Sequence, residues 1–414
     1  MTPTEICKAA AAAAPAVAAL PSRVKDAALA AMADALTGAE ESLVAANERD
    51  VAAARAQGAS ATLVDRLTLT ASRLESMAAG LRAVAAQPDP VGEVVSGWTR
   101  PNGLLIEQVR VPLGVVAVIY EARPNVTADV SGLCLKSGNA CVLRGSSIAL
   151  ESNKAIVEVL RSAVSDAGVP RDAIQLVEDV SRAGATELMQ AKGFVDLLVP
   201  RGGRALIESI EKNAMVPYIV DGDGNCHVYV DRAADPGMAT EIVVNAKAQR
   251  PSVCNAAETL LVHADLAQEW LPGALEALKG AGVEVRGDDR VRSLWPEAAP
   301  ATEDDWATEY LDYKLAVGVV ASLDDAIAHV NRWGTSNAEA IVTEDLAAAR
   351  RFTAEVDSGS IFVNASTRFS DGGEFGYGAE IGISTQKLHA RGPMGLRALT
   401  TTKYVVWGTG QVRT

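Results

Sequence analysis

The fold is decided by residues 113–145, which read LGVVAVIYEARPNVTADVSGLCLKSGNACVLRG. The run Val115–Tyr120 is apolar and rich in β-branched side chains, and residues 140–143 repeat that character. Between them the pattern changes to that of a helix, so the order is strand, helix, strand. This alternation predicts a mainly parallel sheet that is covered by helices on both faces.

The alternation extends outward from this segment in both directions. Short strands are predicted at 174–177, 195–199, 218–220 and 227–230, and in the second half at 259–262, 315–320, 340–343 and 360–363. Helices are expected between most of them, and residues 1–86 also carry apolar positions at helical spacing. A hairpin is predicted at 96–112, with its turn at Pro101-Asn-Gly103. The tail Thr400–Trp407 is β-like and could pair with that hairpin, in the same subunit or in another.

The composition is that of an ordinary soluble protein with more than one domain. The 414 residues are 49% hydrophobic and 22% charged, and the net charge is −14. An acidic chain offers no basic surface for nucleic acid or for acidic membranes. No apolar run approaches the roughly 18 residues of a membrane span. The five cysteines are odd in number, are widely spread and form no C-x-x-C, which argues against disulfides or a zinc site and predicts a reducing, cytoplasmic location.

One of these cysteines has unusual neighbours. Residues 245–262 read NAKAQRPSVCNAAETLLV and place Cys254 just before a predicted strand. Arg250 lies four residues earlier, and polar side chains flank the cysteine on both sides. Such a setting favours the thiolate, which is the nucleophilic form of sulfur. The alternative is an inert free thiol packed under a loop.

Further polar, glycine-rich segments follow predicted strand ends, where open α/β sheets bind their ligands. They are YEARPNV (120–126), KSGNACVLRGSS (136–147), PRGGR (200–204), DGDGNCH (221–227), FVNASTRFSDGGEFG (362–376) and GISTQKLHARGPMG (382–395). Neither G-x-G-x-x-G nor a Walker loop occurs, so a nucleotide site cannot rest on these motifs. His227 and His389 lie in these segments, and a structural role suits each as well as a catalytic one.

Together with the Cys254 segment, these motifs resemble the γ-glutamyl phosphate reductases (glutamate-5-semialdehyde dehydrogenases), a divergent branch of the aldehyde dehydrogenase superfamily. The resemblance covers nearly the whole chain from about residue 20. It implies an aldehyde dehydrogenase-like α/β fold with two doubly wound α/β domains and a small β oligomerisation arm. The implied parts are a cofactor-binding domain (1–97, 113–230 and 381–398), a catalytic domain (231–380), an oligomerisation hairpin (98–112) and an oligomerisation strand (399–414).

The resemblance implies NADPH-dependent reduction of L-glutamate 5-phosphate to L-glutamate 5-semialdehyde, the second step of proline biosynthesis. Cys254 would attack the acyl phosphate and expel phosphate, and hydride would reduce the resulting thioester. Asn125 resembles the superfamily's oxyanion donor, with the Cys254 N–H as a second donor, although a turn asparagine after Pro124 is the alternative. The resemblance also implies a homodimer or homotetramer and a transient contact with glutamate 5-kinase.

The remaining site residues are also carried over from the resemblance. The implied cofactor-binding set is Lys136, Arg144, Ser146, Ser147, Arg201, Gly202, Gly203 and Glu309, and the implied substrate-binding set is Arg123, Arg250, Ser252, Arg368 and Arg391. Arg144 replaces a usual lysine, and its guanidinium beside two serines favours NADPH over NADH. Residues 201–203 precede a predicted helix whose N–H groups could face the pyrophosphate, although an ordinary tight turn also suits them. No metal is expected.

Two other functions stay open. Residues 220–224 lack the glutamate with which hydrolytic aldehyde dehydrogenases activate water, which favours phosphate-linked chemistry. Asp221 or Asp223 could nevertheless act as a base, so a hydrolytic NAD(P)-dependent aldehyde dehydrogenase is the first alternative. A non-catalytic cofactor-binding protein is the second. The sequence does not decide which arginine binds phosphate and which binds the α-carboxylate.

Overall fold

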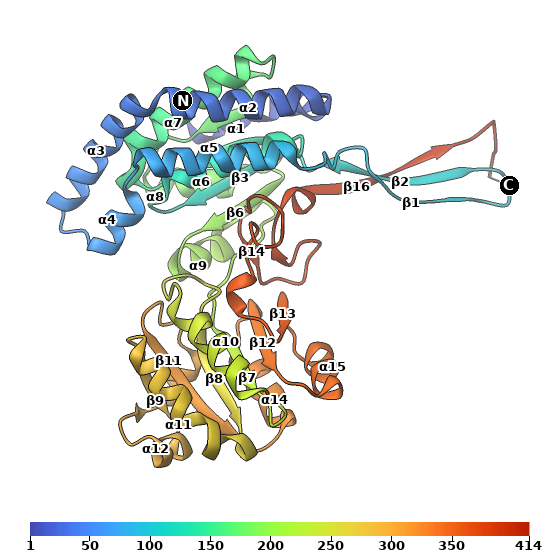
Figure 1. The fold of residues 1–414 in the computed structure, drawn as a ribbon. Coiled ribbons are helices and arrows are strands. Elements are labelled where there is room, and N and C mark those ends of the chain that lie inside the picture. Colours follow the sequence, from blue (N-terminus) through green and yellow to red (C-terminus); the bar gives the residue numbers. More distant parts are fainter. Residues whose placement is uncertain (414) are drawn as a thin grey trace. The chain divides into compact units, whose positions relative to one another are not determined.

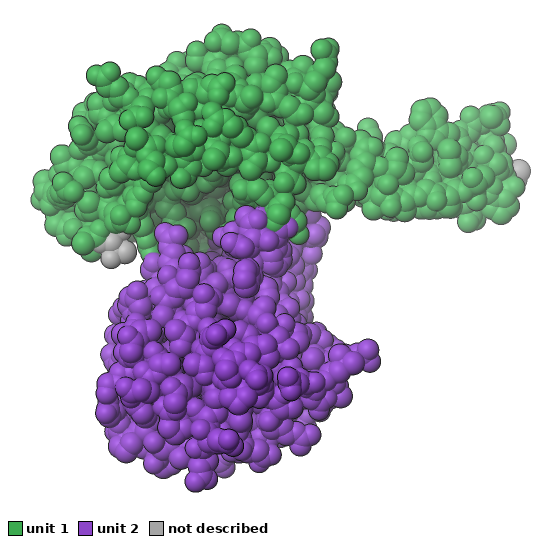
Figure 2. Space-filling model, viewed as in Figure 1, with its two compact units in different colours: residues 1–220, 376–382, 394–414 green, residues 221–375, 383–393 purple. Residues whose placement is uncertain are grey.

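The computed structural model describes residues 1–413 of the chain (Figure 1). The chain divides into two compact units, which Figure 2 shows in different colours. Unit 1 comprises residues 1–220, 376–382 and 394–414, and unit 2 comprises residues 221–375 and 383–393. The first boundary between the units lies near residue 220, where we had expected 230.

Unit 1 contains the sheet that residues 113–145 predict. Its parallel strands are β3 (Val115–Tyr120), β4 (Ala140–Arg144), β5 (Ile174–Leu176) and β6 (Leu197–Arg201), in the order β5-β4-β3-β6. Every residue of β3 is buried, as expected of a central strand with helices on both faces. Helix α6 (Pro124–Lys136) joins β3 to β4 and begins with a proline. Proline loses no hydrogen bond there, because a backbone N–H at the first helical position has no partner within the helix. The predicted strand 218–220 is wrong, because Tyr218 forms only an isolated bridge to Leu198.

Helices pack on this sheet and on one another. They are α1 (Pro3–Ala18), α2 (Ser22–Gly38), α3 (Glu40–Ala56), α4 (Ala61–Leu67), α5 (Ala71–Ala86), α7 (Leu150–Asp166), α8 (Arg182–Met189) and α9 (Arg204–Asn213). Side chains at helical spacing face inward: Leu29, Met32 and Leu36 of α2 are fully buried. The helical prediction for residues 1–86 is therefore confirmed.

Three antiparallel strands form an arm that extends from unit 1 (Figure 1). They are β1 (Val94–Thr99), β2 (Leu105–Pro112) and β16 (Thr400–Trp407), in the order β1-β2-β16. The hairpin turn has Gly103 at φ +85°, a conformation that favours glycine. Strand β16 pairs with β2 along its whole length, so the predicted partnership of tail and hairpin is confirmed within one chain.

Unit 2 contains a seven-stranded sheet in the order β10-β9-β11-β8-β7-β12-β13. Its strands are β7 (Cys226–Val230), β8 (Ala257–His263), β9 (Glu284–Gly287), β10 (Ala299–Pro300), β11 (Lys314–Val320), β12 (Ala338–Val342) and β13 (Ser360–Val363). Its helices are α10 (Pro236–Ala248), α11 (Ala264–Gly280), α12 (Asp289–Leu294), α13 (Glu303–Ala307), α14 (Leu323–Trp333) and α15 (Leu346–Glu355). Placing β7 in the cofactor domain was wrong, because it pairs with β8 and β12 of this sheet.

The short strands β14 (Ile383–Ser384) and β15 (Gly392–Pro393) pair with each other near the end of the chain. The predicted return segment 381–398 is therefore divided, because residues 383–393 belong to unit 2 and the residues on either side belong to unit 1. All five cysteines are free thiols. Within residues 1–413, no helix is both long enough and apolar enough to cross a membrane.

Candidate active site

Cys254 lies in the turn between α10 and β8 and is partly exposed. The buried Cys226 thiol donates a hydrogen bond to the Cys254 carbonyl oxygen at 3.2 Å. On the same side the backbone of Gly224 packs so closely that an added Cβ would lie 1.7 Å from that oxygen. The backbone position of Cys254 is therefore fixed by Gly224 and Cys226, at the start of β7.

Two of the predicted arginines lie near this cysteine. The Arg368 side chain is half-buried and donates through Nε to Gln249 Oε1 at 2.9 Å. Burial lowers the pKa of Arg368 and the charge of Arg250 lowers it further, whereas Asp371 and Cys254 raise it. Arg250, Arg368 and Cys254 are thus close enough to interact electrostatically, and together they could hold an anionic substrate beside a nucleophile.

Asn255 fixes the segment that carries Arg368. Its side-chain amide donates to the carbonyl oxygen of Ser370 at 2.9 Å, and its own carbonyl oxygen accepts from the Thr367 hydroxyl at 2.7 Å. Arg368 belongs to the 3₁₀ helix Thr367–Phe369 between these two contacts. The residue after the cysteine therefore binds the arginine segment directly.

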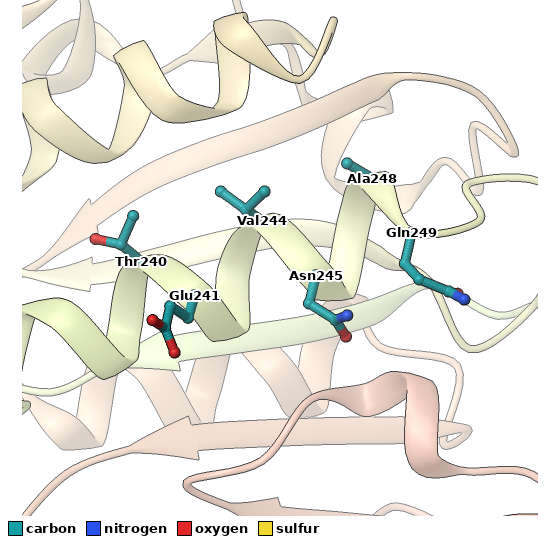
Figure 3. Close-up of a pocket in the computed structure, with 6 residues that line it drawn as sticks. All are labelled: Thr240, Glu241, Val244, Asn245, Ala248 and Gln249. Atoms are coloured by element: carbon teal, nitrogen blue, oxygen red, sulfur yellow. The ribbon is translucent and has the colours of Figure 1, made fainter.

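A shallow pocket of about 610 Å³ lies along α10 (Figure 3). It is lined by Thr240, Glu241, Val244, Asn245, Ala248 and Gln249. None of these belongs to the predicted catalytic, cofactor or substrate sets, so we do not assign the reaction to this pocket. Its relevance to the site is Gln249, which lies at the end of α10 and binds Arg368.

Glu309 is connected to the candidate nucleophile, Cys254, through one glycine. Its carboxylate accepts from the Gly224 N–H at 2.8 Å, and Gly224 packs against Cys254. Burial raises the pKa of Glu309, the hydrogen bond from Gly224 lowers it, and the charges of Asp223 and Asp221 add to the rise. The structure therefore brings together Cys254, Glu309 and the two aspartates that we considered as bases.

In unit 1 two of the predicted residues, Arg144 and Arg201, lie at the carboxyl ends of strands. Residue 144 is paired in register with Ile119, and residue 201 with Tyr120, so Arg144 and Arg201 flank the end of β3. This edge is where open α/β sheets bind ligands. Arg144 donates to the carbonyl oxygens of Val180 (2.6 Å) and Ser181 (2.9 Å).

Two polar atoms at this edge are suited to a bound ligand. Arg144 Nε and Ser146 Oγ are buried and have no hydrogen-bond partner among residues 1–413. Buried polar groups normally have partners, so these atoms fit the phosphate or hydroxyl oxygens of a cofactor. The Gly203 N–H before α9 differs, because it already donates to the Glu121 carboxylate at 3.2 Å.

Lys136 does not fit a cofactor role. It is 1% exposed, and its ammonium group forms an ion pair with Asp26 and donates to the Ala85 carbonyl oxygen at 2.8 Å. These contacts join α6 to α2 and α5, so they argue against contact with a ligand. Arg391 differs, because it forms an ion pair with Asp357 at 2.8 Å while its buried Nε has no hydrogen-bond partner among the described residues.

The other predicted residues lie in loops or at the starts of helices. Arg123 precedes α6 and Ser252 precedes Cys254, and both are half-buried. Ser147 and Gly203 are exposed. An added Cβ at Gly202 would lie 2.9 Å from the Glu121 carboxylate, which explains a glycine there.

Asn125 and Arg201 are brought together by a carboxylate that the sequence did not single out. Asn125 Nδ2, in the first turn of α6, donates to Asp129 at 3.0 Å. Burial raises the pKa of Asp129 to about 6, although Asn125 and Arg201 both lower it. Since the Asn125 amide has two hydrogens, this bond leaves one for an oxyanion.

Replacing Asp129 with asparagine is expected to raise the melting temperature more at pH 8 than at pH 5. The pKa of this carboxyl rises from 3.8 to about 6 on folding, so its protonated form favours the fold. That contribution is complete below about pH 4 and is lost as pH rises through about 6. Asparagine stays neutral throughout. Thermal unfolding of both proteins at the two pH values measures the effect, and an equal change at both would contradict it.

Comparisons with known proteins show the family of this chain. The aldehyde dehydrogenase family model matches residues 3–292 and 315–405. The γ-glutamyl phosphate reductase of Thermobifida fusca is 56% identical over 389 residues, which are 94% of this chain and 93% of the relative. This chain belongs to the γ-glutamyl phosphate reductase branch of the aldehyde dehydrogenase family. The corresponding enzyme of Clostridium beijerinckii is 54% identical over 95% of each chain.

Solved structures agree with this membership. The γ-glutamyl phosphate reductase of Thermotoga maritima has a TM-score of 0.98 at 45% identity and covers 100% of each chain. An acetylating aldehyde dehydrogenase of Geobacillus thermoglucosidasius has a TM-score of 0.69 at 16% identity, which shows the shared fold. The resemblance and the aldehyde dehydrogenase-like fold are therefore confirmed. The chain is an oxidoreductase of the phosphorylating aldehyde dehydrogenase type that uses a nicotinamide cofactor.

Some residues of this γ-glutamyl phosphate reductase family member were missed. Lys247 and Glu258 lie on either side of Cys254 in the sequence and are fully buried. The sequence feature that could have indicated them is a charged residue inside an otherwise apolar helix face or strand. Such a charge is seldom buried unless it is paired, so it indicates a partner. His227 is also buried, with its backbone N–H donating to the Glu339 carboxylate at 2.6 Å and its ring Nδ1 lying 3.0 Å from the Asn225 carbonyl oxygen. These contacts favour a structural role for His227.

Proposed function

We propose that this enzyme reduces L-glutamate 5-phosphate to L-glutamate 5-semialdehyde with NADPH and releases phosphate, as the second step of proline biosynthesis. The substrate is the one in the names of its relatives in Thermobifida fusca and Thermotoga maritima. The observation that carries the proposal is a partly exposed Cys254 on a fixed backbone, with Arg250 and Arg368 in electrostatic range.

In the first step the Cys254 thiolate attacks the acyl carbon, and the carbon–oxygen bond to phosphate breaks. Phosphate leaves with the bonding electrons, and a γ-glutamyl thioester remains on the sulfur. Arg250 and Arg368 would hold the phosphate and the α-carboxylate, because guanidinium groups bind both anions well. The Asn125 amide and the Cys254 N–H would stabilise the tetrahedral oxyanion, a contribution whose loss typically lowers the rate about 10²–10³-fold.

When bound, NADPH supplies the hydride that reduces the thioester. Arg144 and Ser146 would bind its adenosine ribose and 2′-phosphate, since each has a buried atom without a partner among the described residues. Arg201, Gly202 and Gly203 would contact the pyrophosphate. Glu309 would bind the nicotinamide ribose. Cys254 leaves as the thiolate when the tetrahedral product collapses to the aldehyde.

Replacing Arg144 with glutamine should raise the KM for NADPH about tenfold and change the KM for NADH far less. A charge-assisted hydrogen bond to phosphate is worth about 1.5–3 kcal/mol, and NADH has no 2′-phosphate. Lys154→Gln is the control, because Lys154 pairs with Glu178 on the surface. Steady-state kinetics with both cofactors measure the effect. An equal rise for the two cofactors would refute a 2′-phosphate contact.

A hydrolytic enzyme can be distinguished from the proposed one because it releases the acyl group with water and does not need phosphate. In the reverse direction, the proposed enzyme reduces NADP⁺ with glutamate semialdehyde only when inorganic phosphate is present, because phosphate must release the acyl group from Cys254. Steady turnover without phosphate would instead assign the chain to the hydrolytic enzymes, with Asp221 or Asp223 as candidate bases. A non-catalytic protein would show no turnover under either condition.

We also propose that the enzyme is a cytoplasmic homodimer or homotetramer. The arm strand β16 lies at a sheet edge and exposes Tyr404, Val406 and Trp407 by 63%, 52% and 59%. Exposed apolar edge strands favour association. Light scattering on the purified protein measures the state. A transient contact with glutamate 5-kinase remains a prediction, with no surface assigned to it.

A further inference from the structure

Unit 2 contains a fully buried ion pair whose two residues lie on either side of the candidate nucleophile in the sequence. Lys247 near the end of α10 and Glu258 in β8 have side chains that are 0% exposed, and their charged atoms are in contact. Removing two charges from water has a penalty of several kcal/mol per ion, and an apolar pair of similar volume is often as stable. Stability alone therefore does not explain this pair, and its further contacts indicate what else it does.

The second oxygen of Glu258 holds a turn in the chain. The Leu311 N–H donates to Glu258 Oε1 at 3.1 Å. Leu311 has φ +54°, in the left-handed region that non-glycine residues rarely occupy. The Lys247 ammonium lies 5.9 Å from the centre of the Tyr310 ring, so the pair contacts two successive residues of this turn.

The turn directly follows Glu309, which connects to the nucleophile. Glu309 accepts from the Gly224 N–H at 2.8 Å, and Gly224 packs against the Cys254 carbonyl group. Glu258 lies in the strand that follows Cys254, four residues further along the chain. One carboxylate therefore links the nucleophile's strand to the segment that carries Glu309.

We propose that Glu258, held in place by Lys247, is a positioning residue that fixes Glu309 relative to Cys254 through the Leu311 N–H. This inference rests on the proposed function, in which Glu309 binds the nicotinamide ribose. Glu258 acts on cofactor binding and hydride transfer through Glu309, and it does not act on the attack of Cys254 on the acyl phosphate.

Two double variants isolate the Leu311 contact. Lys247→Met with Glu258→Gln removes both charges and keeps an amide oxygen for the Leu311 N–H. Lys247→Met with Glu258→Met removes the same charges and also that acceptor. The first variant should keep the KM for NADPH within about threefold of wild type, whereas the second should raise it about tenfold and lower kcat, because small misplacements near a reacting centre have large kinetic effects.

The rate of the acylation step separates a positioning role from a merely structural one. A general disturbance of the structure would slow acylation, whereas a positioning role toward Glu309 would leave its rate unchanged. Phosphate release from L-glutamate 5-phosphate without NADPH, corrected with a Cys254→Ser blank, should show the same single-turnover rate in wild type and both variants. Equal KM values for the two double variants, or a parallel fall of acylation in the second, would overturn the proposal. Failure of the proposed function is seen separately, as no phosphate release by the wild type.

A single variant keeps the inference testable if the Glu258→Met protein does not fold. Leu311→Gly retains the N–H but removes the side chain that restricts this turn, and glycine populates many backbone conformations. The KM for NADPH should rise at least about threefold without a lower melting temperature, since glycine tolerates a positive φ without strain. An unchanged KM would contradict the positioning role.

Discussion

Replacing Cys254 with serine should reduce kcat by about 10³-fold or more, because loss of a nucleophile removes the covalent pathway. A serine hydroxyl is largely un-ionised at neutral pH, and the charges of Arg250 and Arg368 do not change that enough to restore attack. The substitution is nearly isosteric and the site is partly exposed, so the melting temperature should change little. Steady-state kinetics and thermal unfolding measure the two effects.

Cys226→Ser is the matched control. Cys226 is fully buried and donates to the Cys254 carbonyl oxygen, and a serine hydroxyl can donate in the same way. We therefore expect less than a tenfold loss of kcat, since the donor is kept. Equal losses in the two variants would show that Cys254 matters for local structure and not as the nucleophile.

Replacing Arg368 with glutamine should raise the KM for the acyl phosphate about 10–100-fold, because a charged hydrogen bond is worth about 1.5–3 kcal/mol. Burial already lowers the pKa of Arg368, as does the charge of Arg250, so an anion between the two arginines gains from both. Arg350→Gln on the exposed surface of α15 is the control. Initial rates at varied substrate concentration measure the change, and a KM that moves no more than in the control would exclude a substrate contact.

Much of the fold follows from local pattern. The buried run Val115–Tyr120 and the helix after it fix the first parallel sheet, and Pro101-Asn-Gly103 fixes the hairpin of the arm. The local pattern predicts a strand but does not indicate which sheet that strand joins. Strand β7 is as fully buried as β3, and only its pairing with β8 and β12 assigns it to unit 2.

The sequence indicates Cys254 as a candidate nucleophile but does not indicate several of the residues that surround its segment. The polar neighbours of Cys254 are adjacent in sequence, and Arg368 lies within electrostatic range of both Arg250 and Cys254. Lys136 was misjudged because a lysine in a motif gives no sign that Asp26, more than a hundred residues away, is its partner. Glu258 was missed for the same reason, since its contact with Leu311 depends on tertiary structure.

The central claim is that the acyl group passes through the sulfur of Cys254. Mass spectrometry of acid-quenched enzyme tests it most directly, after incubation with glutamate semialdehyde and NADP⁺ in the absence of phosphate. We predict that the peptide containing Cys254 gains the mass of one glutamyl group and loses it when phosphate is added before the quench. Phosphate-dependent turnover with no adduct on Cys254, or an adduct that phosphate does not remove, would contradict the account.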